Sequence, residues 1–323
     1  MIVDLPDTTS AKISKALVRI REDGGAVALG RVLTLVIATE LGDEEEAIAA
    51  ANDASREHPM RVLVVSRDTS EHARNQESRV NAQIRVGGDA GASEVIVVIA
   101  HGDAALDQES LVTGLLLPDA PVVAWWPGEA PANASESALG RIAQRRITDA
   151  AASANPLDAM YRMCKTYVPG DTDFAWTRLT LWRAQLAAVL DQPPYEPITA
   201  VTVSGAADSP STLLLAAWLQ MQLEVEVSLN VAEGSPVPTG IHSVVLERES
   251  GTISLERNMA SIATLTQPNQ PVHDISLPRR SLRDCLAEEL RRLDPDSLFG
   301  QVVSRGVSEI TASRTANSTK AKI

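Results

Sequence analysis

The sequence has few of the residues that most catalytic and metal sites require. Its 323 residues include two cysteines, Cys164 and Cys285, and five histidines. Secreted domains that depend on disulfides carry more cysteines at regular spacings, so two distant thiols favour a reducing, cytoplasmic setting. No H-E-x-x-H pair occurs, and neither cysteine has a histidine close to it in the sequence. We therefore expect no metal site and no catalytic thiol.

Positive charge and long apolar runs are also scarce. The chain has 29 Lys and Arg against 42 Asp and Glu, a formal net charge of −13. A surface of this sign repels DNA and anionic lipid, so we expect no nucleic-acid or membrane partner. Apolar runs such as Val95–Ala100 are far shorter than the ~20 residues of a membrane span. The acidic start, Met1 to Asp7, lacks the order of a signal peptide, which again predicts a cytoplasmic protein.

Nucleotide-binding fingerprints are missing, with one partial exception. Neither G-x-G-x-x-G nor G-x-x-x-x-G-K-[ST] occurs, and we expect no cofactor. The stretch from Ser204 to Ser209 resembles the S-G-G-x-D-S loop of PP-loop ATP pyrophosphatases, but Ala206 replaces the second glycine. It is either an anion-binding loop or a turn in which a side chain caps the next helix. The candidate residues are Ser204, Gly205, Asp208 and Ser209.

Alternating apolar strands and helical patterns predict an α/β fold. The predicted strands of the first half are 31–39, 60–66, 78–86, 94–101, 121–126 and 145–149. Between them, Gly42-Asp43-Glu44-Glu45-Glu46 begins a helix with carboxylates in its first turn, where the helix dipole favours them. This order indicates a mostly parallel sheet that helices cover on both faces.

A second, smaller α/β domain is predicted after Val168-Pro169-Gly170. It begins with one helix over Asp173–Asp191, continues with a βαβ unit and contains a hairpin that turns at Ser250-Gly251. The closing segment is rich in Ser, Thr, Ala, Lys and Arg, which is typical of a disordered tail. The predicted limits are residues 1–168 for the first domain, 169–305 for the second and 306–323 for the tail.

The aromatic residues are few but concentrated. Trp125 and Trp126 are adjacent at a predicted strand end, so one of them should face away from whatever its neighbour packs on, unless helices cover both faces. The helix from Asp173 carries more aromatic surface than one core normally absorbs, and Trp and Arg are enriched at interface hot spots. The alternative is a central helix packed on both domains. The predicted partner-binding residues are Trp125, Trp126, Phe174, Trp176, Arg178 and Arg183.

Several stretches together resemble the OpcA family of glucose-6-phosphate dehydrogenase assembly proteins. They include His58–Val65, Ala120–Pro127, Asp171–Thr180 with Trp182-Arg183, and Ala207–Ser211 followed by Leu213–Leu219. The resemblance implies a non-catalytic partner that binds the oligomeric dehydrogenase, promotes its assembly and activity, and so supports the oxidative pentose phosphate pathway. In cyanobacteria the family's effect is linked to thioredoxin, but two cysteines without disulfide-like spacing do not predict redox control here.

Three hypotheses follow from the sequence. The chain binds glucose-6-phosphate dehydrogenase and stabilises its active arrangement, it is a nucleotide-binding enzyme that uses the turn at Ser204–Ser209, or it is a scaffold for another metabolic enzyme. A pull-down and a dehydrogenase assay with and without the chain would separate them.

Overall fold

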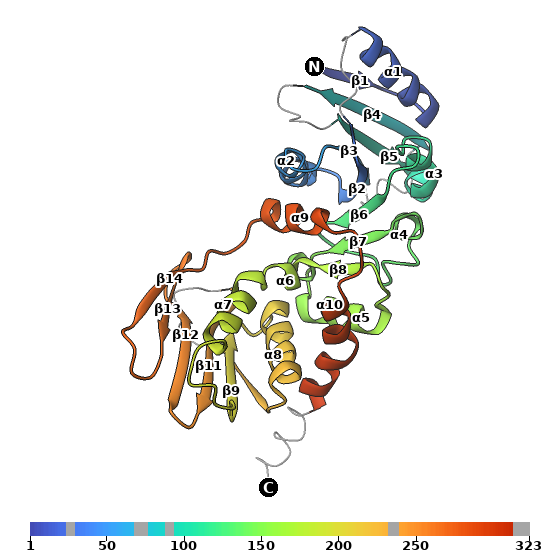
Figure 1. The fold of residues 1–323 in the computed structure, drawn as a ribbon. Helices are drawn as coiled ribbons and strands as arrows, with labels where there is room; N and C mark the ends of the chain where they lie inside the picture. The colour runs from blue at the N-terminus through green and yellow to red at the C-terminus, as the bar shows by residue number, and fades with distance from the viewer. Residues whose placement is uncertain (24–29, 68–76, 88–93, 232–238, 313–323) are drawn as a thin grey trace. The chain divides into compact units, whose positions relative to one another are not determined.

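The computed structural model describes residues 1–23, 30–67, 77–87, 94–231 and 239–312 (Figure 1). The chain folds into two compact units, and neither is a single continuous stretch of sequence. The first unit contains residues 1–149, 170–172 and 281–295, and the second contains residues 150–169, 173–280 and 296–323. The chain therefore passes between the units several times.

The first unit is built on an eight-stranded sheet with the order β1-β4-β5-β3-β2-β6-β7-β8. The five strands from β5 to β7 in this order are parallel, and β4 and β1 are added antiparallel at one edge. This confirms the mostly parallel sheet. The strands are β1 (Ile2–Leu5), β2 (Leu33–Glu40), β3 (Met60–Arg67), β4 (Arg79–Val86), β5 (Glu94–His101), β6 (Val122–Trp126), β7 (Arg145–Thr148) and β8 (Asp171–Asp173).

Helices cover both faces of this sheet, as the unbroken apolar strands require. On one face, α1 (Ser10–Asp23), α3 (Gln108–Thr113) and α4 (Ala138–Ile142) bury side chains such as Ile13 and Leu139 against Leu63 and Ile96. On the other face, α2 (Glu44–Ala54) packs with α9 (Leu282–Arg291) (Figure 1). Between β5 and β6 the chain forms a 3-10 turn, Gly102–Ala105, followed by α3.

Segments from later in the sequence complete the β7 edge of the first unit. The Arg145 guanidinium is buried and donates through Nε to Glu289 on α9, with 3.1 Å between Nε and Oε2. The neighbouring Arg146 is paired with Asp171 on β8, and this pair is also buried. Two adjacent arginines of β7 thus take their carboxylates from outside residues 1–168.

The second unit has a six-stranded sheet with the order β10-β9-β11-β12-β13-β14. Strands β9 and β10 are parallel and enclose α8 in a βαβ unit, while the other pairs are antiparallel. The predicted hairpin is confirmed as β11 and β12, and Gly251 adopts the positive φ of +121° that favours glycine. The strands are β9 (Ala200–Gly205), β10 (Val227–Val231), β11 (Ile241–Arg248), β12 (Gly251–Arg257), β13 (Ile262–Thr266) and β14 (His273–Ser276).

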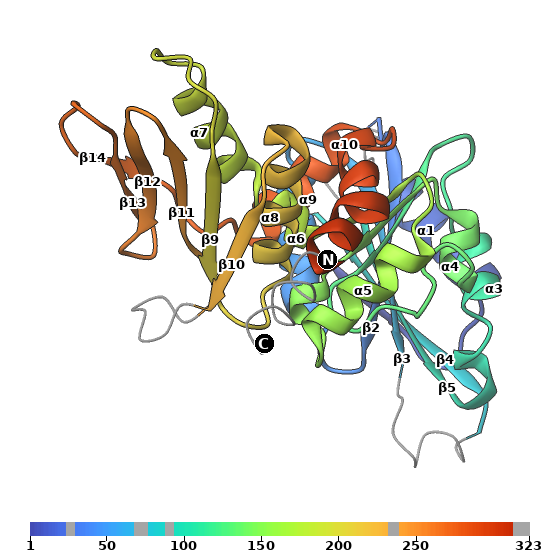
Figure 2. The same cartoon turned by 90° about the horizontal axis from the view of Figure 1, so that it is seen from below.

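The helices of the second unit gather on one face of its sheet (Figure 2). They are α5 (Pro156–Thr166), α6 (Phe174–Thr177), α7 (Thr180–Leu190), α8 (Pro210–Leu223), α10 (Ser297–Gln301) and a π-helix (Val302–Gly306). Their core contains Trp176, Trp182 and Phe299, all at most 2% exposed. The single helix predicted over Asp173–Asp191 is wrong in one respect, because it breaks between α6 and α7.

The described part of the predicted tail is helical. Helix continues from the π-helix to residue 312, and Val307 and Ile310 are buried in the core of the second unit. Apolar positions three residues apart let this stretch pack, so the tail prediction is wrong for residues 306–312. Residues 313–323 lie outside the described part of the chain.

Candidate functional site

The tryptophan pair of β6 is buried on both sides. Trp125 is 0% exposed and Trp126 is 3% exposed, although their side chains point to opposite faces of the sheet. Trp126 packs in the cluster that α1, α3 and α4 form with the sheet. β6 lies between β2 and β7, so both of its edges are paired, and the burial of both rings shows that both of its faces are covered. The expectation of an outward-facing ring is not met.

The same strand borders the place where doubly wound sheets usually bind ligands. The chain runs from β2 to β3 on one side and later returns to β6 on the other side of β2, which makes this a topological switch point. Nucleotide-binding folds place phosphate at the helix that follows the first strand. Here the carboxylate of Glu44 lies there, accepting from the Gly42 amide at 3.0 Å and pairing with the Ser66 hydroxyl. A carboxylate in this position repels a phosphate.

In the second unit, Asp173 fixes the start of the aromatic segment. Its Oδ1 accepts from the Ala175 amide at 2.8 Å, and its Oδ2 accepts from the Ala150 amide at 2.9 Å. Asp173 is therefore a helix cap for α6, and the same carboxylate ties α6 to the chain at Ala150. Behind this cap, Phe174 is 0% exposed and Trp176 is 1% exposed.

Two arginines lie over these buried rings. The Arg183 guanidinium carbon is 3.8 Å from the centroid of the Trp176 ring, and that of Arg178 is 5.9 Å from the Phe174 ring. Both arginines are half-buried. We call Arg178 and Arg183 the stacked arginine pair. Stacking on an aromatic face holds a guanidinium in one orientation. Arg183 Nη2 also donates to Thr180 Oγ1 at 3.5 Å.

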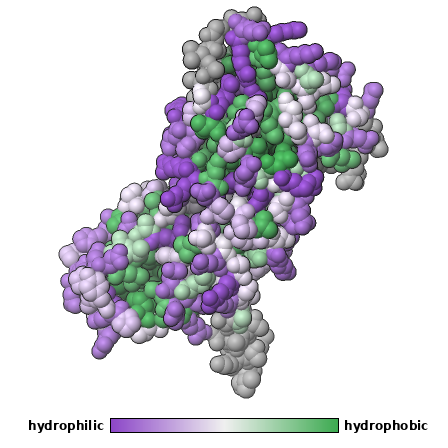
Figure 3. All heavy atoms as spheres, turned by 45° about the vertical axis from the view of Figure 1, so that its right-hand side comes forward, coloured by the Kyte–Doolittle hydropathy of each residue, from purple (hydrophilic) through white to green (hydrophobic). Residues whose placement is uncertain are grey.

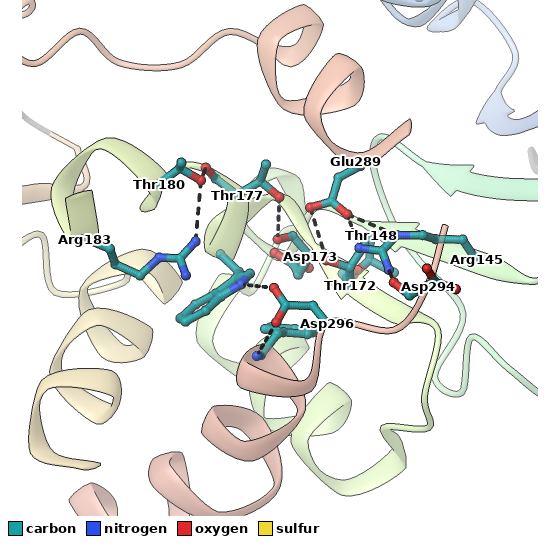
Figure 4. Close-up of polar contacts among 12 residues, drawn as sticks. Arg145, Thr148, Thr172, Asp173, Thr177, Thr180, Arg183, Glu289, Asp294 and Asp296 are labelled. Atoms are coloured by element: carbon teal, nitrogen blue, oxygen red, sulfur yellow. Dashed lines mark hydrogen bonds and ion pairs between the residues drawn. The ribbon is translucent and has the colours of Figure 1, made fainter. Parts of the chain in front are cut away.

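Asp296 completes this arrangement, and the sequence did not indicate it as a functional residue. Its Oδ2 accepts from Trp176 Nε1 at 2.8 Å, and its Oδ1 accepts from the Phe299 amide at 2.9 Å, which caps α10 (Figure 4). The indole is thus held between a carboxylate at its edge and the Arg183 guanidinium on its face. A helix cap near Asp294–Asp296 is predictable from the local pattern, but a bond to an indole 120 residues away is not.

The residues of the predicted anion-binding loop form a tight turn with a helix cap. Ser209 Oγ accepts from the Thr212 amide at 3.1 Å and caps α8. Gly205 has no room for a side chain, since a Cβ would lie 2.3 Å from Thr212 Oγ1 and 2.7 Å from the Gly240 oxygen. The Ala206 amide donates to that same oxygen at 2.9 Å. Asp208 is exposed and Ser204 is half-buried. Local packing accounts for these residues, and the anion-binding role stays a prediction.

A hollow in the first unit lies beside the start of α2. This cavity of about 480 Å³ is lined by apolar side chains such as Leu5 and Ile99 together with the charged groups of Asp4, Glu45 and Arg85. Arg85 donates to Glu45 at 2.7 Å, and this hydrogen bond, more than the positive charge of Arg85, lowers the pKa of that carboxyl. Figure 3 shows a face on which apolar areas of each unit are bordered by hydrophilic side chains.

The described residues contain neither a metal cluster nor a membrane span. No group of three or more His, Cys, Asp or Glu side chains in these ranges could hold a metal ion. No helix among the same residues is long and apolar enough to cross a bilayer. Burial, with a smaller effect of Asp173, raises the pKa of the Cys164 thiol to about 12, so this cysteine lacks the character of a reactive thiol.

Family models match the chain on both sides of residue 168. Residues 51–165 match the N-terminal domain of the glucose-6-phosphate dehydrogenase subunit (OpcA assembly) family, and residues 169–303 match its C-terminal domain. The chain belongs to the OpcA family. The two OpcA matches leave residues 166–168 between them, whereas in the fold residues 150–169 are part of the second compact unit. The predicted limits at residue 168 therefore stay a prediction.

Outside the OpcA family, the chain is similar to solved structures only at low sequence identity. No curated protein sequence matches it. Solved structures with similar folds include a 3-ketoreductase from Actinomadura kijaniata in complex with TDP-benzene and NADP, with TM-score 0.49 and 12% identity over 88% of this chain and 97% of that one. Myo-inositol dehydrogenase from Lactobacillus casei has a TM-score of 0.45 and 11% sequence identity, with 88% of this chain and 95% of that chain covered. The transcriptional regulator Gal80p from Kluyveromyces lactis has a TM-score of 0.45 and 9% sequence identity, with 93% of this chain and 96% of that chain covered.

Proposed function

We propose that this OpcA chain binds glucose-6-phosphate dehydrogenase in the cytoplasm and promotes its assembly, its activation or both, without catalysing a reaction itself. The observation that carries the proposal is the pair of family matches, which cover both units and are described as parts of a subunit of that dehydrogenase. This role would support the oxidative pentose phosphate pathway.

The proposal has a defined energetic form. A binding protein shifts its partner toward an active arrangement only by its difference in affinity for the two arrangements. A coupling free energy of about 1–3 kcal/mol would change the dehydrogenase's apparent affinity for substrate roughly 5–150-fold. The glucose 6-phosphate KM of the purified dehydrogenase, measured as this chain is titrated in, therefore tests the function directly.

We further propose that the stacked arginine pair contacts the dehydrogenase, with the aromatic rings lying behind it. Phe174 and Trp176 are too deeply buried to touch a partner, and Trp125 and Trp126 can contribute only by supporting the surface above them. An arginine fixed by stacking loses little side-chain entropy on binding, and it pairs with carboxylates through two parallel hydrogen bonds. We expect carboxylates of the dehydrogenase to be its partners.

The variant Arg183→Gln tests this contact, and Arg162→Gln is the control. Arg162 is an exposed residue of α5 in the same unit, so both variants lose one positive charge. If Arg183 is a hot spot worth about 2 kcal/mol, its replacement should weaken dehydrogenase binding roughly 30-fold, while Arg162→Gln should leave binding near that of the unchanged chain. Circular dichroism would verify that both variants fold.

The outcomes separate the two parts of the proposal. If Arg178→Gln and Arg183→Gln both fold and bind the dehydrogenase like the unchanged chain, the surface assignment is wrong while the function stands. If the unchanged chain alters neither the oligomeric state nor the KM of the dehydrogenase, the function itself is wrong. The contacts of the turn at Ser204–Ser209 do not favour the nucleotide-binding alternative, because Gly205 packs closely on Thr212 and Gly240 and the Ala206 amide already donates to the Gly240 oxygen.

A further inference from the structure

Three arginines of the first unit converge on one carboxylate at the amino end of β5. Glu94 begins that strand and is only 2% exposed in its side chain. Arg61 on β3 donates to Glu94 Oε1 through Nε at 2.8 Å, Arg31 reaches Oε2 at 3.1 Å, and Arg21 on α1 lies 3.2 Å from both oxygens. We call Arg21, Arg31, Arg61 and Glu94 the Glu94 cluster.

The cluster has an excess of positive charge in an acidic protein. Three guanidiniums against one carboxylate give a local charge of +2, from +3 and −1, in a chain whose formal charge is −13. Among the described residues, Glu94 is the only carboxylate that pairs with these arginines. The pKa of Arg61 is lowered, first by burial, while Glu94 raises it and the like charges of Arg21 and Arg31 lower it further.

Burial makes this excess costly unless another anion offsets it. Side-chain exposure is 7% for Arg61, 15% for Arg31 and 38% for Arg21, so the cluster opens toward solvent on the side of Arg31 and Arg21. Desolvating cations without an equal number of anions costs free energy, and a protein keeps such an arrangement most readily where a ligand supplies the missing charge.

The two more exposed arginines of the cluster keep unused hydrogen-bond donors. Arg21 and Arg31 both reach Glu94 through Nη2, and the Nε atom of each is buried without a hydrogen-bond partner. Arg61, by contrast, also donates through Nη1 to the Leu115 oxygen at 2.6 Å and is held in the fold. Each of the two outer arginines therefore has one unused N–H beside the Nη2 group that binds Glu94. Adjacent guanidinium donors of this kind bind oxyanions with parallel hydrogen bonds.

We propose that the Glu94 cluster binds a phosphate monoester dianion. A phosphate group carries a charge near −2 at neutral pH and has three strong acceptor oxygens, which match the excess charge of +2 and the forked donors of Arg21 and Arg31. Glu94 holds the three guanidiniums together while the site is empty. The phosphate comes either as free inorganic phosphate or on a small phosphorylated metabolite, since the recognising chemistry is the same.

Isothermal titration calorimetry of the full chain tests the proposal. The ligands are inorganic phosphate and glucose 6-phosphate, with glucose as the uncharged comparison and chloride holding the ionic strength constant. Arg31→Gln is the test variant because it leaves the buried pair of Arg61 and Glu94 in place. Arg141→Gln is the control, since Arg141 is also paired with a glutamate of the first unit, Glu109, but at an exposed position.

We expect the unchanged chain and Arg141→Gln to bind a phosphate ligand equally, and Arg31→Gln to lose about 10–100-fold in affinity. Tighter binding of glucose 6-phosphate than of inorganic phosphate would identify a metabolite site, and equal affinity would identify a phosphate site. Absence of binding by the unchanged chain, or an affinity that Arg31→Gln leaves intact, overturns the proposal. If Arg31→Gln does not fold, Arg21→Gln replaces it as the test variant, because Arg21 is the more exposed of the two arginines. The same criteria then apply.

Discussion

Removing the carboxylate of Glu289 should destabilise the first unit strongly, although the residue lies near the end of the sequence. Arg145 and Glu289 have side chains that are 5% and 6% exposed. In Glu289→Gln, the Arg145 guanidinium keeps its hydrogen bond to the Asp294 backbone oxygen at 2.8 Å. It loses the carboxylate of Glu289, which is its one ion-pair partner among the residues that the structure describes. Breaking a buried ion pair on one side typically costs about 3–5 kcal/mol, because the remaining charge is left uncompensated.

The double variant Arg145→Met with Glu289→Met separates the two contributions to this cost. Replacing both charged groups by apolar ones removes the desolvation penalty together with the attraction, so the double variant should lie near the unchanged chain in stability. Urea unfolding followed by hydrogen exchange and mass spectrometry of peptides from β6 and β7 would report on the first unit alone. Glu57→Gln is the control, because Glu57 pairs with Arg291 of α9 at an exposed site, where an ion pair contributes little.

Two results would refute this reasoning. The first is a folded Glu289→Gln variant whose unfolding free energy changes by less than about 1 kcal/mol, well below the range for a broken buried pair. The second is a double variant that is no more stable than Glu289→Gln, which would mean that the lost stability comes from altered packing of α9.

Two further predictions follow from the same contacts and from Cys164. A fragment of residues 1–168 lacks Glu289 and Asp171, so Arg145 and Arg146 of β7 lose their paired carboxylates. This fragment should show no cooperative thermal transition by circular dichroism. A sharp transition would contradict the prediction. Cys164, with its pKa raised to about 12, should react with iodoacetamide at pH 8 about a thousandfold more slowly in the native chain than after unfolding. A native rate within tenfold of the unfolded rate would show that its thiol is accessible to redox chemistry.

The sequence predicted the central strands β2, β3, β5 and β6 well because each is a largely continuous apolar run, whereas the short strands β1 and β8 were not predicted. Strand β5, for example, has the predicted limits of Glu94 and His101. The helix over Asp173–Asp191 was predicted as one element because its apolar spacing is continuous, but Asp173 caps a short first turn and the chain bends at Arg178-Leu179 before α7. Tertiary contacts decided this break, and periodicity alone does not report them.

For the site residues, the sequence likewise indicated which residues are unusual but not which distant residues they contact. The sequence identified Trp176 and Arg183 as unusual, yet their stacking depends on a fold that no spacing rule describes. Charged residues that open buried strands, such as Arg61 and Glu94, are a visible signal of a buried ion pair, but the sequence does not say which charges meet. The membership of α9 in the first unit could not be predicted, since Glu289 reaches a partner 144 residues earlier in the chain.

That separation has a consequence during protein synthesis. Ribosomes add roughly 5–20 residues each second, and domains usually fold in order as they emerge. Glu289 is synthesised 144 residues after Arg145, a delay of roughly seven to thirty seconds before it can neutralise the arginine. The first unit of this protein is therefore completed only after Glu289 has left the ribosome, and a chain terminated before that residue would lack a stable first unit.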